Sequence, residues 1–573
     1  MLSVTGIWLY MFLTTFLAGY GILQTLTRYI PYRVRHTDTY LLCGLAAVTV
    51  YAQLISLFGR VGLAANLLLL AVCLVILWHN RQELGRRLQE KWRRIQGNQS
   101  GVFEERGRMV LIGFLFFLFA YGTSRGMIHY DTGLYHAQSI RWLEEYGAVK
   151  GLGNLHCRLA YNSSSFALSA LYSMSFLGGK SCHCAAGWLA FLLARICLEI
   201  AAPLRMGRLR VSDFARVMGI YYLVNIFDEM ISPASDYFMV LLAFCILIRW
   251  MDLLEEGVRD IFPYGMLCVM GVFLMTVKLS AALILLLVFY PAYYLLKERR
   301  WKETGIYLAL GIVTALPFFI RNVLLSGWLV YPFTRIDLFD VKWKIPKGMA
   351  DYDAREIQVW GRGYSDVSRY EIPVGEWLPD WFRSLAGSDK LLVLAAALAV
   401  CILILYAAGM VAGLWKKRWD MLLVQVTAAA SFVFWLCTSP LIRYGCVYVY
   451  LTPAIVFGCV YKGLVSGHKE EAEKEQPWRK AVRMCGTAVA ALLIAYKCLA
   501  LGREIAGSYV NDYWLVQKDY DTYETVSYEI EGQVFYYPVE GDQTGYDAFP
   551  SAPTKAEITF LGTDMRDGFS AAR

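Results

Sequence analysis

Long apolar stretches alternate with short polar ones from the first residues of the chain to about residue 500. The apolar runs are continuous, whereas a transmembrane β-barrel needs alternating residues, so a barrel is excluded. Because a helix needs roughly 20 residues to cross a bilayer, the pattern predicts an all-α polytopic membrane protein of about 14 transmembrane helices. The predicted spans are 2–23, 39–58, 61–78, 109–127, 184–201, 213–227, 237–250, 261–277, 279–296, 303–320, 390–414, 420–438, 446–464 and 481–500.

Two long polar segments and a polar tail interrupt or follow these spans. Residues 128–182 form a first large loop, in which 133–147 and 164–177 have helical spacing and are expected to lie at the membrane interface. Residues 321–389 form a second large loop. After about residue 501 the chain is polar, and Glu531-Gly532 lies between two strand-like runs that end at Val539, which predicts a β-hairpin.

The tail carries one more strand signal, at Glu557 to Leu561, so we expect a small β-containing cap. The chain then divides into five parts. They are accessory transmembrane helices with a basic loop (1–108), a transmembrane core (109–320), the second loop (321–389), C-terminal transmembrane helices (390–500) and an external tail (501–573).

Composition agrees with a membrane protein, and charge adds an orientation. Only 18% of the residues are charged, where a soluble protein has about a quarter. Lysine and arginine gather in a few loops, most strongly between Arg81 and Arg108, and such loops stay in the cytoplasm. We therefore expect a multi-pass protein of a bacterial plasma membrane with both termini and both large loops outside. The net charge of +8 follows from these loops and does not indicate nucleic-acid binding, which needs a basic groove on a soluble domain.

Ionisable residues at the external ends of the spans are the candidates for chemistry, because a charge at membrane depth is costly and rare without a function. Asp131, directly after an outward span, is the candidate general base; the alternative role is an N-cap of the next helix. The cations on the same side favour an anionic headgroup ligand, although each could also reach toward the surface without binding one. The candidate substrate-binding residues are Tyr135, His136, His156, Arg158, Asp236, Lys278, Arg321, Asn322, Arg443 and Tyr444.

The sequence leaves the question of a metal or cofactor open, and a divalent cation is one option. Cys182-His183-Cys184 is the single cluster of metal-ligating residue types, and no second pair of ligands follows it at the usual spacing. The second loop is rich in tryptophan, which is suited to stacking on sugar rings and equally to an interfacial aromatic belt. These residues are Trp328, Trp343, Trp360, Trp377 and Trp381.

Five short segments combine into a recognisable order along the chain. They are Thr276-Val277-Lys278, Leu316-Pro317-Phe318-Phe319-Ile320-Arg321-Asn322, Ser326-Gly327-Trp328, Tyr331-Pro332-Phe333 and Ser439-Pro440-Leu441-Ile442-Arg443-Tyr444-Gly445. Over roughly 109–460 this order resembles the GT-C superfamily of membrane glycosyltransferases, of the type that uses polyprenyl-phosphate sugars. The chain also looks like a bacterial family of multi-pass membrane proteins of unassigned function with an Asp-x-x-x-Tyr-His segment. Two departures from the GT-C pattern are Thr132, where that family has a second acidic residue, and the three spans before the core.

The resemblance implies a GT-C-like core and transfer of a sugar from a lipid-linked donor to a cell-envelope glycan, lipid or protein on the extracytoplasmic face. Asp131 would take the proton of the acceptor hydroxyl, while Lys278, Arg321 and Arg443 would stabilise the leaving phosphate. The alternatives are a transporter or flippase of lipid-linked glycans, a polymerase or ligase of surface polysaccharide, and a non-catalytic scaffold. Membrane lipids are expected partners, and the donor sugar, acceptor, linkage and oligomeric state stay open.

Overall fold

The computed structural model describes residues 1–573 except 97–101, 413–418, 466–475, 509–511 and 573. Within the described residues, twelve helices are long and apolar enough to cross a membrane, which indicates a multi-pass membrane protein. They are α1 (Leu2–Tyr29), α2 (Thr37–Phe58), α3 (Leu63–Gln96), α4 (Val102–Ser124), α7 continued by α8 (Ala185–Cys197, Ala201–Met206), α10 (Ser235–Glu255), a 3₁₀ segment continued by α12 (Leu279–Val288, Phe289–Lys297), α13 (Trp301–Ser326), α16 (Gly387–Val411), α17 (Trp419–Thr438), α18 (Ile442–Val465) and α19 (Pro477–Gly507).

Two other predicted spans also fold as helices, but they are short. They are α9 (Val211–Asn225) and α11 (Ile261–Val277), with 15 and 17 residues. At 1.5 Å per residue they reach about 23 and 26 Å, less than the roughly 30 Å of a bilayer core. Each predicted span thus overlaps a helix, and twelve rather than about 14 of these helices have the length to cross a membrane.

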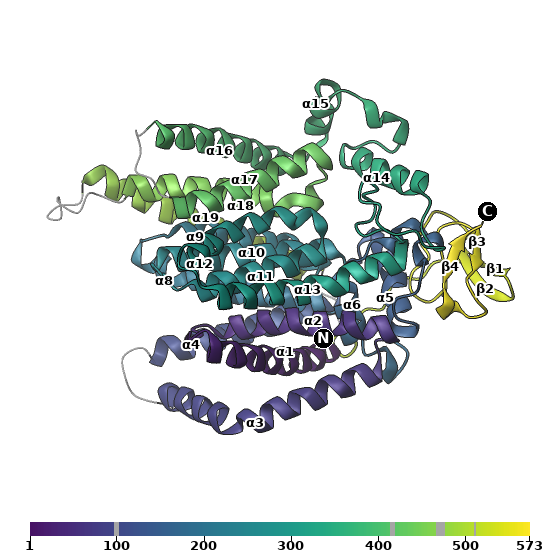
Figure 1. Cartoon of the computed structure of the whole chain (residues 1–573). Coiled ribbons are helices and arrows are strands. Elements are labelled where there is room, and N and C mark those ends of the chain that lie inside the picture. Colours follow the sequence, from purple (N-terminus) through teal and green to yellow (C-terminus); the bar gives the residue numbers. More distant parts are fainter. Residues whose placement is uncertain (97–101, 413–418, 466–475, 509–511, 573) are drawn as a thin grey trace.

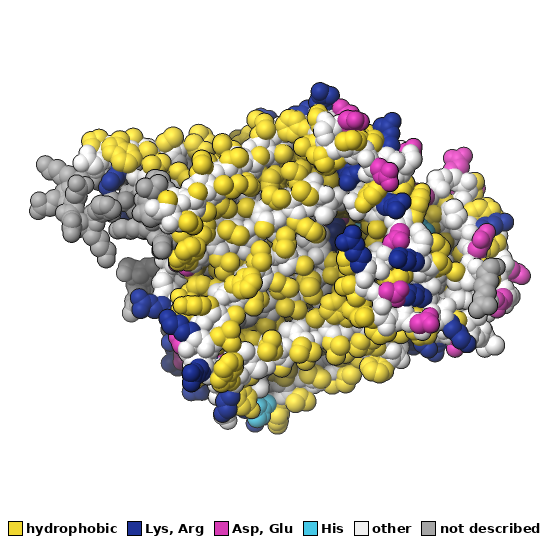
Figure 2. All heavy atoms as spheres, turned by 45° about the horizontal axis from the view of Figure 1, so that its top comes forward, with side chains coloured by type: hydrophobic (Ala, Val, Ile, Leu, Met, Phe, Trp, Pro, Cys, Tyr) yellow, Lys and Arg dark blue, Asp and Glu magenta, His cyan; other side chains and the backbone are white. Residues whose placement is uncertain are grey.

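The long helices lie side by side, with α1 to α4 along one flank, α16 to α19 along the other, and α10 between them (Figure 1). We call the end that carries residues 125–183, the second loop and the strands the site end, and the opposite end the basic end. In Figure 2 hydrophobic side chains cover the flank of the long helices, and charged side chains gather toward the two ends. This distribution is what a protein embedded in a bilayer needs.

The two helices predicted in the first loop are confirmed as α5 (Ala137–Glu145) and α6 (Ser164–Tyr172). They do not lie exposed at an interface as expected, because the rest of the site end covers them. In α5 both Trp142 and Glu144 are buried, and the Glu144 carboxylate accepts hydrogen bonds from Ser181 and Tyr546. The C-terminal tail, which supplies Tyr546, therefore encloses the first loop.

The tail contains the predicted hairpin, with β1 (Thr525–Ile530) antiparallel to β2 (Gln533–Pro538). Glu531 and Gly532 both have positive φ, at 49° and 82°, as a two-residue type I′ turn requires. The strand signal at Glu557 to Leu561 is confirmed as β3 (Ile558–Phe560), which pairs with β4 (Phe569–Ala571). β4 was not predicted, because Ser570 and Ala571 are not residues that favour strands.

The second loop folds into α14 (Lys347–Gly361) and α15 (Val374–Ser384), and its tryptophans pack against the chain. The indole N–H groups of Trp328, Trp343 and Trp381 donate to backbone carbonyls at 2.8–3.0 Å. Trp360 and Trp377 lie under the guanidinium groups of Arg158 and Arg362. These contacts give each of the five rings a role in packing.

Candidate functional site

Asp131 lies at the start of a short π-helical turn, Thr132–His136, which continues directly into α5. π-helical turns are rare and are often found at functional sites. The Asp131 side chain makes no capping hydrogen bond, so the N-cap alternative is not realised. The carboxylate instead accepts a hydrogen bond from Arg443 Nη2 at 2.8 Å.

Arg443 joins Asp131 to a second carboxylate. Its Nε lies 3.3 Å from Asp236 Oδ2, and Asp236 is in turn paired with the ammonium group of Lys278. The four side chains form a row of alternating charge, which we call the charge row: Asp131, Arg443, Asp236 and Lys278. Each member lies beside a group of opposite sign, which is the arrangement that partly buried charges require.

Each member of the charge row comes from a different segment of the chain. Asp131 precedes α5, Asp236 is in the first turn of α10, Lys278 caps the C-terminus of α11, and Arg443 is in the first turn of α18. A carboxylate at a helix N-terminus and a cation at a C-terminus are both favoured by the helix dipole. The Tyr444 ring lies beneath both cations, 4.2 Å from Lys278 Nζ and 5.2 Å from the guanidinium carbon of Arg443.

The charge row is accessible but not freely solvated. The exposed fractions of its side chains are 14% for Asp131, 21% for Arg443, 7% for Asp236 and 22% for Lys278. Charges so placed interact more strongly than in water, because the surrounding protein has a lower effective dielectric constant. A small polar ligand could therefore reach the row, and its charge would be felt strongly there.

Burial by itself raises the pKa of the Asp131 carboxyl, but the positive charge of Arg443 above all outweighs it and holds that pKa below its usual value. His129 lies against Arg443, and its Nδ1 accepts a hydrogen bond from the backbone N–H of Asp131 at 3.0 Å. Burial and then the Arg443 charge lower the pKa of His129. At neutral pH the site therefore presents a charged carboxylate beside a neutral imidazole.

A kink in α18 positions Arg443. Gly445 has a non-helical backbone, and a Cβ at that position would lie 2.3 Å from the Trp435 ring, so only glycine allows this close approach. The indole N–H of Trp435 donates to Leu441 O, and that of Trp381 donates to Pro440 O. The turn before Arg443 is thus held from α15 and α17.

The polar run from Asn162 to Ser165 fixes two other elements of the site end. Ser163 donates to the carbonyl of Val277 at 2.8 Å, and Thr276 donates to Ser164 at 3.0 Å. These bonds hold the last turn of α11, which is the turn that places Lys278. Asn162 donates in the same way to α13, at Phe318 O and Asn322 Oδ1.

Arg321 and Asn322 lie outside the charge row. Asn322 is bonded to Asn162 and to Leu329 O. Arg321 is 2% exposed beside a small cavity that Tyr161, Asn162 and Phe166 also line, and among the described residues its Nε and Nη1 have no hydrogen-bond partner. No contact joins Arg321 to Lys278 or Arg443, the other two cations that the sequence suggested as phosphate partners.

The remaining candidates from the first loop lie in the turn after Asp131, as His136 does, or in the segment between α5 and α6, as His156 and Arg158 do. His136 contacts Thr132 at 3.2 Å, and its ring packs on Tyr135 and Phe166. Arg158 pairs with Glu356 at 3.4 Å and lies 4.4 Å from the Trp360 ring. His156 is largely buried, and among the described residues its Nδ1 has no partner.

Sequence reasoning did not find the contribution of the tail to this site. Thr544 and Gly545 donate their backbone N–H groups to Gly133 O at 2.9 Å, and Tyr130 pairs with Asp542. A Cβ at Gly133 would lie 2.6 Å from the hydroxyl of Tyr523. These contacts clamp the turn that carries Asp131, and a local sequence pattern gives no sign of them.

Sequence reasoning also missed His129, although its place two residues before Asp131 was a usable signal. In the described parts of the chain, no three His, Cys, Asp or Glu side chains come together as metal ligands. In the cluster around His183, the histidine ring packs 4.2 Å from the Tyr520 ring instead.

The chain belongs to a family of unknown function. The family model described as "Domain of unknown function (DUF8201)" matches residues 1–450. A comparison with the curated proteins and one with the solved structures found no match. The matched region contains all four members of the charge row and ends before the tail that clamps Asp131.

Buried histidines predict a loss of stability in acid. Burial lowers the pKa of His136 to about 3 and of His183 to about 4; burial and then the Arg158 charge lower the pKa of His156 to about 3. The unfolded chain binds these protons near pH 6.5 and the folded chain does not, so stability falls as the pH drops below about 6.5. Each histidine contributes about 1.4 kcal/mol per pH unit.

We therefore expect His156→Gln to make the fall in unfolding free energy between pH 6 and 4 shallower by about 1.4 kcal/mol per pH unit. The measurement is unfolding in detergent micelles titrated with SDS at each pH. His79→Gln, at an exposed histidine, serves as the control and should leave the slope unchanged. Equal slopes in wild type and His156→Gln would contradict the assignment of a neutral buried His156.

Proposed function

We propose that this member of the family is a membrane glycosyltransferase of the GT-C type, which moves a sugar from a polyprenyl-phosphate donor to a cell-envelope acceptor. The observation that supports this most is the charge row itself. It sets one carboxylate, Asp131, at one end of a row that also holds two cations. A transfer from a lipid phosphate needs both, a base for the acceptor and positive charge for the leaving group.

In the proposed reaction the acceptor hydroxyl gives its proton to Asp131 while its oxygen bonds to the anomeric carbon. The bond from that carbon to the donor phosphate breaks, and the electron pair stays on the phosphate oxygen. As Asp131 is protonated its charge disappears, so Arg443 loses one of its two carboxylate partners. The positive charge of Arg443 is then available to stabilise the negative charge that develops on the phosphate. Lys278, the second cation of the row, lies on the far side of Asp236.

The residues around the charge row have supporting roles in this proposal. Tyr444 forms the floor of the site, since its ring lies beneath both cations, while Tyr135 and His136 pack against each other in the turn after Asp131. Arg158 adds long-range positive charge that favours the ionised form of Asp131 and holds its pKa down. Arg321 is assigned no part in the transfer step, because no contact joins it to the row.

We further propose that the site end faces the outside of a bacterial plasma membrane. The basic residues at the opposite end, among them Arg86, Arg93 and Arg208, support this orientation, since cytoplasmic loops are enriched in arginine and lysine. Both chain ends then lie outside: the backbone N–H of Leu2 donates to Trp514 O, so the two ends share one side.

Asp131→Asn tests the proposed base. The variant keeps the size of the side chain but removes the basic oxygen, and loss of a general base costs about 10²- to 10⁴-fold in rate. Cells carrying this variant should lose the envelope glycan that cells with the wild-type chain make, measured by mass spectrometry of surface glycans at matched membrane levels.

Glu145→Gln is the matched control, because Glu145 is an exposed carboxylate at the end of α5. It should leave the glycan profile unchanged. A transferase defect also predicts that the lipid-linked donor accumulates in the Asp131→Asn cells. An unchanged glycan profile in those cells would remove the catalytic role of Asp131.

Reporter fusions test the orientation. Alkaline phosphatase fused after residue 573 should be active and green fluorescent protein at the same position dark, because only the former folds to an active state outside the membrane. Fusions after Gln96, at the basic end of α3, should give the reverse result. A fluorescent fusion at residue 573 would contradict the orientation.

A further inference from the structure

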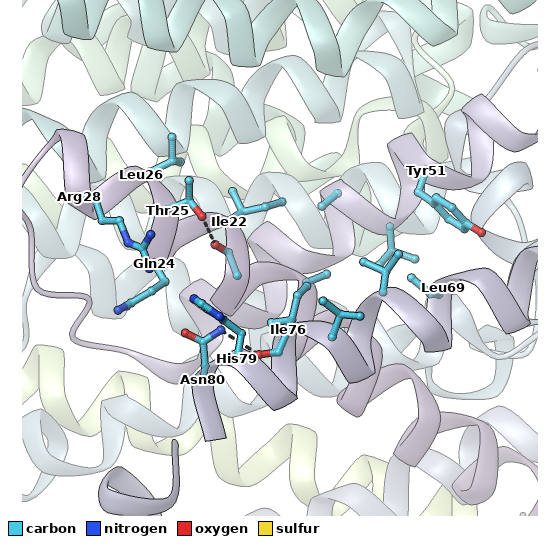
Figure 3. Close-up of a pocket in the computed structure, with 16 residues that line it drawn as sticks. Ile22, Gln24, Thr25, Leu26, Arg28, Tyr51, Leu69, Ile76, His79 and Asn80 are labelled. Atoms are coloured by element: carbon cyan, nitrogen blue, oxygen red, sulfur yellow. Dashed lines mark hydrogen bonds between the residues drawn. The ribbon is translucent and has the colours of Figure 1, made fainter. Parts of the chain in front are cut away.

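A groove lies far from the charge row, on the flank of the molecule between α1, α2 and α3. It has a volume of about 610 Å³. Its walls along most of its length are aliphatic or aromatic side chains, including Val48, Tyr51, Leu69 and Ile76. Figure 3 shows that the polar lining residues gather at one end, where Gln24, Arg28, His79 and Asn80 lie together.

A second, polar hollow of about 550 Å³ adjoins the polar end of the groove, and Gln24 lines both. Its walls carry Arg33, Arg86, Arg87, Glu83 and Glu90. We call the apolar length of the groove the channel and the polar hollow the chamber. The channel therefore lies beside the spans and opens into the chamber at the basic end.

The charges of the chamber are not balanced. The Glu83 carboxylate is paired with Arg87 at 2.5 Å and accepts a hydrogen bond from Gln24 at 3.1 Å. Among the ion pairs of the described residues, which include those of the nearby Arg35 and Arg87, none involves Arg28, Arg33 or Arg86. With Arg87, four arginines face two glutamates here, which leaves a positive chamber at the mouth of an apolar channel.

We infer that this groove binds one anionic phospholipid, with an acyl chain along the α1–α2–α3 channel and the phosphate headgroup among Arg28, Arg33 and Arg86. The channel from Leu69 to Asn80 follows α3 for about 16 Å, which suits the length of a hydrocarbon chain. A zwitterionic headgroup would bring its own cation into a chamber that is already positive, so the net negative headgroup is preferred.

The groove lies within the first helices, outside the region of the charge row, so this site is independent of the proposed transferase activity. The position also fits a lipid as the occupant, since only 22% of the apolar stretch of α3 is buried and α3 supplies one wall of the groove. In Figure 1, α3 lies at the edge of the bundle. A bilayer lipid can enter such a groove sideways, with its headgroup staying at the level of the basic end.

Native mass spectrometry of the full chain in detergent tests the inference. Phosphatidylglycerol and phosphatidylcholine with identical acyl chains are added at equal concentration. We expect the protein to retain at least five times more phosphatidylglycerol than phosphatidylcholine. Arg28→Gln combined with Arg86→Gln should abolish this preference, and Val72→Trp should fill the channel and lower retention of both lipids.

Two matched controls change residues of α3 that do not line the groove or the hollow. Leu74→Trp adds the same ring on the same helix at a residue that does not line the groove, and both Val72 and Leu74 are well exposed, at 47% and 53%. Arg81→Gln removes an arginine that stacks on Trp78 and lines neither hollow. Both controls should bind phosphatidylglycerol as the wild type does.

Equal retention of the two lipids by the wild type would overturn the inference, as would full retention by Val72→Trp. Displacement of phosphatidylglycerol by inorganic phosphate at constant ionic strength would also overturn the inference. Binding would then depend on the phosphate group, with no contribution from the acyl chain. Thermal unfolding of every variant in the same detergent confirms that each one is folded.

Discussion

A charge that leaves water must find an opposite charge, and Arg443 satisfies this condition for two carboxylates at once. It stands between Asp131 and Asp236, and Lys278 completes the pairing of Asp236. Removing one partner of a fully buried pair commonly costs about 3–5 kcal/mol, because the charge left behind has no compensation, and in this partly exposed row the cost should be smaller. The four segments that supply these side chains are therefore tied together by the same contacts that create the site.

The rest of the site end can be understood as support for this row. α11 stops at Val277 and the chain turns at Lys278, so the ammonium group meets the start of α10. The kink at Gly445 sets the direction of Arg443, and the tail holds the turn beside Asp131 through Gly133. The site is thus assembled from residues more than 400 positions apart in the sequence, counted from Gly133 to Thr544.

Hydropathy and loop charge predicted much of this structure. The helices, the hairpin around Glu531-Gly532 and the candidate residues Asp131, Asp236, Lys278 and Arg443 all follow from local patterns, and these four residues do meet. What local patterns do not contain is which helices become neighbours. For that reason the sequence showed neither that Arg321 lies apart from Lys278 and Arg443, nor that the tail contacts the turn after Asp131, nor which backbone groups the tryptophans contact.

The most direct test of this account is a double-mutant cycle between Asp131 and Arg443, measured as free energies of unfolding in detergent micelles titrated with SDS. Arg443→Gln alone leaves two carboxylates, Asp131 with no cation and Asp236 with Lys278 only, and should be the most destabilised variant. Adding Asp131→Asn removes one of them, so the double variant should be more stable than the sum of the single effects predicts, by about 1 kcal/mol or more. Additivity within about 0.5 kcal/mol would contradict the charge row.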